Sequence, residues 1–339
     1  MRDSLRRLAS NDEMGDIRPR RSYGKTKRVQ AELLDGTLIE IDVDRKARGG
    51  DLLDKVCESL DIREKDYFGL QREARDRRLW IDLGKRLSKT FKNEPWDVRL
   101  AFKFYPPEPS QLLEDLTRYQ LTLAVRRDLL EGRLSCSSIT SALLASYILQ
   151  AELGDCESET AIPLDMLTEL HVADKDDPGM LMDKIMQFYQ NHKGLTPAES
   201  ELSYLENAKK LFLYGAELHP ALDCEDVEIA LGVCANGISV YRDNVLLNRF
   251  PWAKILKISF NKRAFILELR PTEYEEVTSV VTFRVMTSRA CKELWKSSVE
   301  QHMFFRRATP VSVARVPGWG RLGSRTFSCR RTLTQLRAV

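Results

Sequence analysis

The stretch Asp97-Val-Arg-Leu-Ala-Phe-Lys-Phe-Tyr-Pro-Pro-Glu-Pro109 marks a boundary between two kinds of structure. Every second residue from Val98 to Phe104 is large and apolar, which predicts a strand with one buried face. The Pro-Pro-Glu-Pro run at 106–109 suits neither a helix interior nor a central strand, so we interpret it as a linker. One folding unit therefore ends near Tyr105, and a second begins after the linker.

The segment before this boundary has the pattern of a hairpin, a helix and short strands. Residues 29–33 and 39–43 alternate in hydropathy on either side of Asp35-Gly36, a pair typical of hairpin turns. Apolar residues at helical spacing, from Leu52 to Leu60, follow Gly49-Gly50. Short strands are expected at 68–70 and 79–83, and 97–105 closes the unit. This order is typical of a ubiquitin-like fold.

Residues 110–215 have a helical period instead. The clearest helix starts at Thr196, where Pro197 and Glu199 complete a capping box, and it is expected to end at Gly215. Residues 154–180 are interpreted as a looser connection. Apolar stripes predict three earlier helices, which carry Leu112, Leu116, Tyr119 and Leu123; Ile139, Leu143, Tyr147 and Leu153; and Leu181, Ile185, Phe188 and Tyr189.

From residue 217 the period returns to two. A final helix is predicted from Ser288 to about Phe304, and no periodicity continues beyond Arg306. An antiparallel sandwich closed by one C-terminal helix is the plan of pleckstrin-homology and phosphotyrosine-binding domains, so the fold class is α+β with three lobes. The expected strands are 226–234, 237–242, 245–252, 255–260, 264–270 and 279–286, with turns at Asn236-Gly237 and Asp243-Asn244.

The composition is that of a globular protein of two or three folding units. The 339 residues include 53 Lys and Arg, 50 Asp and Glu and 4 His, which gives a formal net charge of +3. The start of the chain has no apolar signal segment, and no stretch approaches the ~20 apolar residues of a membrane span. The 7 Cys are scattered without a C-x-x-C pair, the pattern of reduced thiols, so we expect a cytosolic protein.

Charge is distributed unevenly along the chain. Residues 1–28 carry a net charge of +5, residues 306–339 carry +8 from eight Arg and no acid, and the remainder carries −10. Such basic tails either face an anionic surface, such as a membrane, an acidic partner or nucleic acid, or extend as solvated chain. The sequence leaves both interpretations open.

No arrangement of residues indicates catalysis, so we expect a protein that is not an enzyme and needs no cofactor. The 4 His lie in different segments without a partner three or four positions away, which leaves a metal site unsupported. Phosphatase, hydrolase-elbow and Walker motifs do not occur. Gly318-Trp-Gly-Arg-Leu-Gly323 has the dinucleotide spacing but lacks the strand and helix that this motif requires. Nucleic acid is disfavoured as a partner, since the Arg-rich tail lacks interleaved aromatic residues.

Several short motifs in this sequence resemble those of FERM modules. They are Asp66-Tyr-Phe-Gly-Leu70, Phe102-Lys-Phe-Tyr-Pro-Pro-Glu-Pro109, Leu116-Thr-Arg-Tyr119, Gln150-Ala-Glu-Leu-Gly-Asp155, Phe250-Pro-Trp252 and Ala290-Cys-Lys-Glu-Leu-Trp295. Runs that resemble the protein 4.1 (band 4.1) branch are Glu206-Asn-Ala-Lys-Lys-Leu211, Ile229-Ala-Leu-Gly-Val-Cys234 and Lys254-Ile-Leu-Lys-Ile-Ser259. The resemblance implies a basic tail at 1–26, a ubiquitin-like lobe at 27–105, a helical lobe like acyl-CoA-binding protein at 106–216, a PH/PTB-like lobe at 217–307 and a basic FERM-adjacent tail at 308–339.

The function that this resemblance implies is a non-catalytic adaptor between membrane and cytoskeleton. Its implied partners are cytoplasmic tails of transmembrane proteins, phosphoinositides or other anionic lipid, and, indirectly, the cortical cytoskeleton. It implies a location in the cytoplasm and cytoskeleton, at the cytoplasmic face of the plasma membrane and at cell junctions. The alternative is the N-terminal targeting region of a FERM-containing tyrosine phosphatase.

The resemblance also implies two kinds of binding site. A tail peptide is expected to add as a strand between the fifth strand of the sandwich and the final helix, although plain core packing is the alternative for the helix residues. The residues implied to edge this groove are Leu256, Ile258, Phe260, Cys291, Leu294 and Trp295. The cations implied to contact lipid are Lys254, Lys257, Lys262 and Arg263, together with Lys25, Lys27, Arg28, Lys46 and Arg48.

The resemblance and the Arg-containing motifs also indicate two regulatory features. Lys209 and Lys210 lie in a segment that resembles a calmodulin-contacting helix, which makes calmodulin a candidate partner. Phosphorylation by basophilic kinases is expected to subtract positive charge and weaken membrane contact. The candidate phosphosites, each preceded by nearby Arg, are Ser10, Ser324, Ser328 and Thr332.

Overall fold

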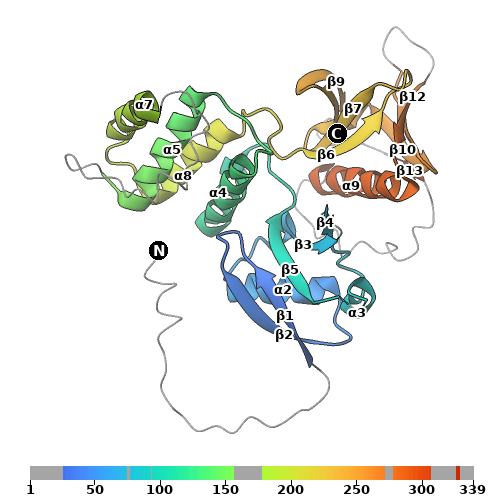
Figure 1. Ribbon diagram of the computed structural model, residues 1–339, viewed down its shortest axis with the longest axis horizontal. Coiled ribbons are helices and arrows are strands. Elements are labelled where there is room, and N and C mark those ends of the chain that lie inside the picture. Colours follow the sequence, from blue (N-terminus) through green and yellow to red (C-terminus); the bar gives the residue numbers. More distant parts are fainter. Residues whose placement is uncertain are drawn as a thin grey trace, which may run out of the picture.

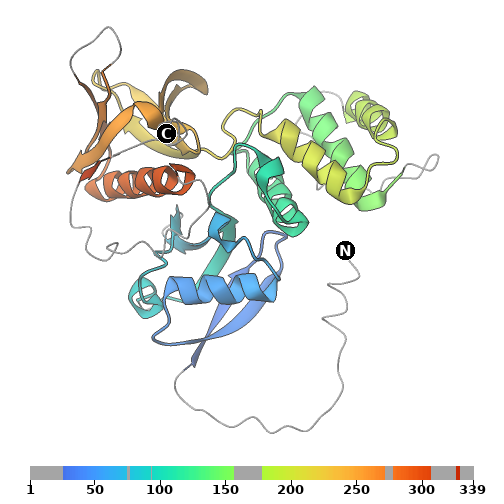
Figure 2. The same ribbon diagram turned by 180° about the vertical axis from the view of Figure 1, so that it is seen from behind.

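The computed structural model describes residues 26–74, 77–92, 94–155, 178–271, 278–306 and 326–328. Three lobes surround a common centre, and the linker after Tyr105 joins the first lobe to the second there (Figures 1 and 2). The elements of the first lobe lie within residues 26–102, those of the second within 109–208 and those of the third, up to its closing helix, within 217–306. The three-lobed α+β architecture predicted from the sequence is therefore present.

The first lobe is a five-stranded sheet covered by one helix. Its strands are β1 (Thr26–Glu32), β2 (Leu38–Asp44), β3 (Phe68–Ala74), β4 (Arg77–Trp80) and β5 (Asp97–Phe102), in the order β2-β1-β5-β3-β4. β1 and β5 run parallel, and the other pairs are antiparallel. Helix α2 (Gly49–Ser59) buries Leu52, Leu53, Val56 and Cys57 against the sheet. The hairpin-helix-strand order is the one predicted. A short helix, α3 (Leu87–Thr90), was not predicted.

The second lobe is helical, with α4 (Asp115–Leu130), α5 (Ser138–Leu153), α7 (Pro178–Gln190) and α8 (Pro197–Ala208). The capping box at the start of α8 is confirmed, since Thr196 Oγ1 accepts from the Glu199 amide and the Glu199 carboxylate accepts from the Thr196 amide. Residues 156–177, most of the expected loose connection, lie outside the described residues.

Two details of the second lobe correct the sequence predictions. The stripe predicted for α5 is wrong at both ends, because Ile139 and Leu153 are exposed while Ala142, Leu144, Ala145 and Leu149 are buried. Helix α8 ends at Ala208 rather than near Gly215, because the chain turns towards the third lobe and both Leu213 and Gly215 have positive φ. A Cβ at Gly215 would lie 2.5 Å from the Tyr105 Cβ, so glycine is required at this close approach.

The third lobe is an antiparallel sheet closed by a long helix, as predicted. Its strands are β6 (Glu217–Leu222), β7 (Glu228–Cys234), β8 (Gly237–Arg242), β9 (Val245–Pro251), β10 (Ile255–Asn261), β11 (Ala264–Leu269) and β12 (Ser279–Val285), and its helix is α9 (Ser288–Arg306). A further strand, β13 (Thr326–Ser328), pairs with β10 and gives the order β13-β10-β11-β12-β6-β7-β8-β9. The sequence indicated no such strand, because three residues are too few to show a period.

Helix α9 also joins the third lobe to the first. The ring of Phe304 stacks on that of Phe104, with centroids 4.2 Å apart and planes 10° apart, and meets Tyr67 edge-on at 5.2 Å. One turn earlier, Glu300 accepts a 2.7 Å hydrogen bond from the Lys103 ammonium, and both side chains are about nine-tenths buried. The helix that closes the sandwich is therefore also part of the first lobe's core.

Candidate functional site

The edge of β10 beside α9 is where the sequence placed a peptide groove. The Trp295 indole, only 6% exposed, donates a 3.1 Å hydrogen bond to the carbonyl oxygen of Ile258. The Trp295 ring lies 5.5 Å from that of Phe260. Helix α9 is thus fixed to the backbone of β10 at mid-strand.

The six residues predicted to edge the groove divide into two groups. Ile258, Cys291 and Leu294 are completely buried in the sandwich core, so the core-packing alternative accounts for these side chains. Leu256 and Phe260 are half-buried and Trp295 is nearly buried. Of the six side chains, Leu256 and Phe260, near the two ends of β10, therefore keep the most exposed surface.

The β10 edge carries a strand in the structure. Strand β13 pairs antiparallel with it, in the register Lys257 with Ser328, Ile258 with Phe327 and Ser259 with Thr326. Ile258, whose carbonyl oxygen accepts the hydrogen bond from Trp295, is therefore in the middle one of these three residue pairs. The edge is compatible with an added extended segment.

The third-lobe cations predicted to bind lipid are spread along β10. Lys254 precedes the strand, and Lys262 and Arg263 form the turn after it, with Lys262 at φ 53°. At about 3.3 Å per residue the two ends are roughly 20 Å apart. Lys257 lies between them, half-buried, and pairs with Glu268 on β11 at 2.6 Å. Among the described residues, no carboxylate lies within ion-pair distance of the exposed Lys254, Lys262 or Arg263.

The first-lobe cations are placed differently. Lys27 lies over the Trp96 ring at 4.4 Å, and Arg28 pairs with Glu40 at 3.0 Å and more loosely with Asp42. Lys46 and Arg48 are exposed in the segment before α2, and Lys25 lies outside the described residues. The structure does not gather these residues with those of the third lobe into one compact cluster.

The predicted regulatory residues lie in different surroundings. Lys209, at the C-cap of α8, is held by the carboxylates of both Glu108 and Glu206, whereas Lys210 is exposed. Ser328 lies on β13 opposite Lys257. Ser10, Ser324 and Thr332 lie outside the described residues.

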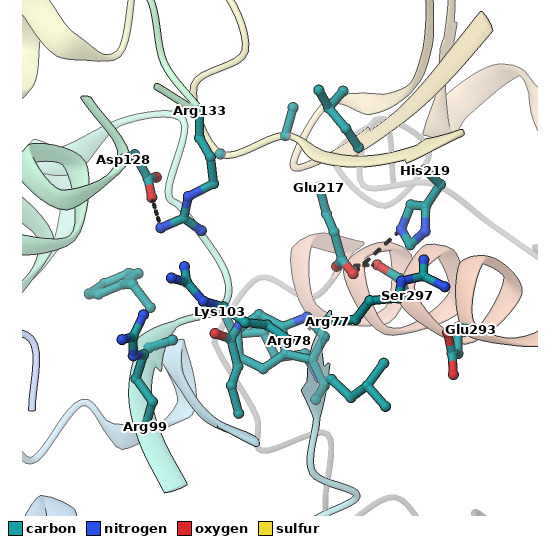
Figure 3. A pocket seen from close by; sticks show the side chains of 18 of the residues that line it. Arg77, Arg78, Arg99, Lys103, Asp128, Arg133, Glu217, His219, Glu293 and Ser297 are labelled. Atoms are coloured by element: carbon teal, nitrogen blue, oxygen red, sulfur yellow. Dashed lines mark hydrogen bonds and ion pairs between the residues drawn. The ribbon is translucent and has the colours of Figure 1, made fainter. Parts of the chain in front are cut away.

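A cleft of about 1150 Å³ lies where the three lobes meet, and the sequence analysis did not anticipate it. Figure 3 shows first-lobe cations, among them Arg78 and Lys103, facing Asp128 of the second lobe and Glu217 of the third. An ion pair connects the first and second lobes here. The Arg78 guanidinium donates to both carboxylate oxygens of Glu131, with Nη2 to Oε1 at 2.9 Å. The adjacent Arg77 and Arg78 were a possible signal of this cleft in the sequence. The partner of Arg78, Glu131, is 53 positions away, so no local pattern could connect them.

Ionisation in the cleft follows from these pairs. Burial raises the pKa of Asp82, but the Lys296 charge and hydrogen bond at 3.1 Å outweigh it and lower the pKa overall. The pKa of Glu131 is also lowered. Burial alone would raise it, but the hydrogen bond from Arg78 and the positive charge of Arg133 outweigh burial. The cleft cations are thus largely neutralised by carboxylates that link the lobes.

Burial is the largest influence on the pKa of two other groups near the centre. Burial is the main reason why the pKa of Tyr105 is raised, and its hydroxyl donates to Asp128 at 2.7 Å. Burial also lowers the pKa of His219, so the imidazole beside Glu217 is neutral near pH 7. No group of three His, Cys, Asp or Glu in the described ranges could hold a metal ion. Across those same ranges, every helix is too short or too polar to cross a membrane.

Comparison with protein families decides the identity of the lobes. The FERM N-terminal domain matches residues 31–93, the FERM central domain residues 107–219 and the FERM C-terminal PH-like domain residues 223–312. The Protein 4.1 homolog of Drosophila melanogaster is 50% identical over 295 residues, or 87% of this chain. The chain belongs to the protein 4.1 family of FERM-domain proteins. The resemblance drawn from the sequence is thereby confirmed.

Other relatives agree with this placement. Protein 4.1 of Bos taurus is 42% identical over 91% of this chain. The FERM domain of Drosophila Merlin, in a structure of its complex with the C-terminal domain, superposes with a TM-score of 0.73 at 27% identity and covers 82% of this chain and 96% of that one. This chain spans 17% of the Drosophila relative and 50% of the bovine one.

Proposed function

We propose that this FERM module is a membrane–cytoskeleton adaptor that binds cytoplasmic tails of transmembrane proteins at the β10 edge. The observation that supports this most directly is the strand β13, which already occupies that edge by antiparallel pairing. Backbone pairing at a sheet edge supplies affinity for extended peptides with little demand on their sequence. The family membership supports the same role.

Lipid binding in this proposal rests on the exposed cations of the third lobe. Lys254, Lys262 and Arg263 have no carboxylate partner among the described residues, whereas the cleft cations Arg78 and Lys103 are paired. An unpaired cation can exchange its hydration for contact with anionic headgroups without first breaking an ion pair. Lys257 is excluded from the set because Glu268 holds it.

The location follows from these two activities. An adaptor of this kind acts at the cytoplasmic face of the plasma membrane and reaches the cortical cytoskeleton through other proteins. Phosphate on Ser328 or on the other candidate serines and Thr332 would subtract positive charge from the tails and weaken membrane contact. Calmodulin is the less supported partner, because Lys209 is already engaged by two carboxylates.

Vesicle co-sedimentation tests the lipid part. The test variant is K254E/K262E/R263E, and the control is K92E/K193E/R242E, which reverses one exposed cation in each lobe away from β10. Each basic residue near an anionic leaflet is worth about 1 kcal/mol, so losing three attractions weakens binding roughly 100-fold.

The proposal predicts that wild type and control sediment with vesicles containing phosphatidylinositol bisphosphate, more at low than at physiological salt. The test variant should remain in the supernatant. Equal losses in the two variants, or binding by the test variant at wild-type strength, would contradict it. Binding by the test variant at wild-type strength would instead indicate that the basic tails at 1–28 and 306–339 make the membrane contact.

A further inference from the structure

Helix α8 carries a carboxyl group on the face that packs against α4 and α5. The buried residues that mark this face are Ser200, Tyr204, Leu205 and Ala208. Glu201 lies one turn before Tyr204 and Leu205 and is itself partly buried, so its side chain belongs to the same face. A carboxylate in such a position needs a partner, because burial disfavours its charge.

Glu201 borders a small cavity between α4, α5 and α8. The cavity has a volume of about 30 Å³, and apolar side chains such as Leu123 and Ile148 contribute to its wall. Thr122 and Tyr204 also line it, and both are more than nine-tenths buried. Neither of their hydroxyl groups has a hydrogen-bond partner among the described residues. These surroundings suit a neutral carboxyl group better than a carboxylate.

The cations near Glu201 are engaged by other carboxylates. On α4, the Arg118 guanidinium pairs with Asp115, and Arg126 pairs at 3.1 Å with Glu152 of α5. No hydrogen bond or ion pair joins Glu201 to another residue in the described part of the chain. Three carboxyl groups thus share two guanidinium groups, and ionised Glu201 would leave the cluster with an unbalanced negative charge.

The other titratable groups at this site are tyrosines and a histidine. Tyr119 from α4, Tyr147 from α5 and Tyr204 line the cavity, and burial raises the pKa of Tyr204 further. Tyrosine hydroxyls are ordinarily neutral between pH 6 and pH 8. The ring of Tyr147 stacks on His192, and burial lowers the pKa of that imidazole. Proton binding by the folded lobe in this range therefore falls to Glu201.

We propose that Glu201 is a proton-binding group that controls how firmly α8 is held against α4 and α5. When protonated, the carboxyl group packs at the cavity as a neutral group; when ionised, it is repelled by Asp115 and Glu152. Burial and the charge of Asp115, opposed by Arg118 and supported by Glu152, raise the pKa of Glu201 from 4.5 to about 7. The group lies far from the β10 edge in sequence and in lobe, so this inference is independent of the proposed tail binding.

Proton binding and helix packing are linked. Because the pKa of Glu201 is higher in the closed lobe than in the open one, its protonation stabilises the packed helix. This contribution is present at low pH and is lost as the pH rises through about 7. The ratio of closed to open α8 should therefore fall about tenfold between pH 6 and pH 8 for the full shift, or about fourfold after screening by solvent.

Hydrogen exchange of the full chain at pH 6 and pH 8 tests this. The readout is the protection of amides within 197–208, corrected for the intrinsic exchange rate at each pH. Glu201→Gln keeps the shape of the protonated side chain but cannot ionise. Glu58→Gln is the matched control, because Glu58 is exposed on α2 of the first lobe. Comparison with the wild type removes the contributions of His192 and His302, whose lowered pKa acts in the opposite direction.

The expected result concerns the ratio of protection in the wild type to protection in Glu201→Gln. This ratio should be about 4- to 10-fold lower at pH 8 than at pH 6. Glu58→Gln should behave as the wild type does. Glu201→Gln should be at least as well protected as the wild type at both pH values, since glutamine has no charged form to bury. An identical pH response in the wild type and Glu201→Gln would overturn the proposal, because the proton would then bind elsewhere.

Asp115→Asn tests the cluster without changing Glu201. The substitution removes one repelling charge and releases Arg118, so the pKa of Glu201 should fall. The change in α8 protection between pH 6 and pH 8 should then shrink by about half. Asp183→Asn, which neutralises an exposed carboxylate on α7 of the same lobe, is the matched control and should respond as the wild type does. An unchanged pH response in Asp115→Asn would contradict the proposed cluster.

Discussion

Phe304→Ala should uncouple the third lobe from the first. Phe304 is 3% exposed, and its ring stacks on Phe104 and meets Tyr67 edge-on. Truncation removes the aromatic contact that the end of α9 makes with the first lobe's core. The remaining links would be polar, namely the Lys103–Glu300 pair, the Lys296–Asp82 pair and the hydrogen bond from Gln301 to the Lys103 carbonyl, together with the weaker Phe305–Phe104 contact.

The magnitude follows from burial. Truncating a buried Phe to Ala costs about 3–5 kcal/mol, the sum of lost transfer energy and an unfilled cavity. With a urea dependence of about 2–3 kcal/mol per molar, the midpoint of unfolding should fall by about 1–2 M. Urea titrations followed by circular dichroism and tryptophan fluorescence measure it. Noncoincident curves would reveal lobes that unfold separately.

The adjacent Phe305 provides the matched control. It is half-buried and its ring centroid is 6.2 Å from that of Phe104, so Phe305→Ala should cost only about 1 kcal/mol. Equal midpoint shifts for the two variants, or a shift below 0.5 M for Phe304→Ala (about 1 kcal/mol by the same slope), would refute the assignment of Phe304 as the interlobe anchor.

Two further predictions concern charged groups on or near α9. Lys103→Met should destabilise by about 3 kcal/mol, because it leaves the buried Glu300 with only the longer 3.8 Å ion pair to Lys296. Lys103→Met/Glu300→Leu should recover most of the loss, and additive losses in urea titrations would contradict this. Burial lowers the pKa of His302 to about 4, so the unfolded chain binds the proton first and stability should fall by about 2 kcal/mol between pH 7 and pH 5. The same pH difference should be smaller in His302→Gln, and an identical pH profile for the two proteins would show that His302 is not its source.

Most of the fold could be predicted because the signals are local. The alternation in the sandwich strands, the Asp35-Gly36 turn and the Thr196–Glu199 capping box each depend on residues within a few positions. The α5 stripe failed because that helix packs against both α7 and α8, so its buried surface follows its neighbours rather than one row of large residues. The end of α8 was missed because the turn is set by the approach of Gly215 to Tyr105 from another lobe.

The candidate site was predicted only in part, for the same physical reason. Its position beside β10 and α9 came from the resemblance to FERM modules, but which side chains remain accessible depends on packing, and Cys291 and Leu294 are core residues. The interlobe cleft needs Arg78 and Glu131 to meet from different lobes, which no local pattern encodes. Strand β13 gave no signal, because its partner is the backbone of β10 rather than a periodic face.

The measurement that tests the central claim most directly is a hydrogen-exchange footprint of a bound tail peptide. An array of synthetic cytoplasmic tails of plasma-membrane proteins would be screened with the full-length chain. The retained peptide would then be added to the same protein in solution. The account predicts new protection within 255–261 and in the part of α9 around Trp295. Protection confined to the interlobe cleft, for example around Arg78, with β10 unchanged would contradict it.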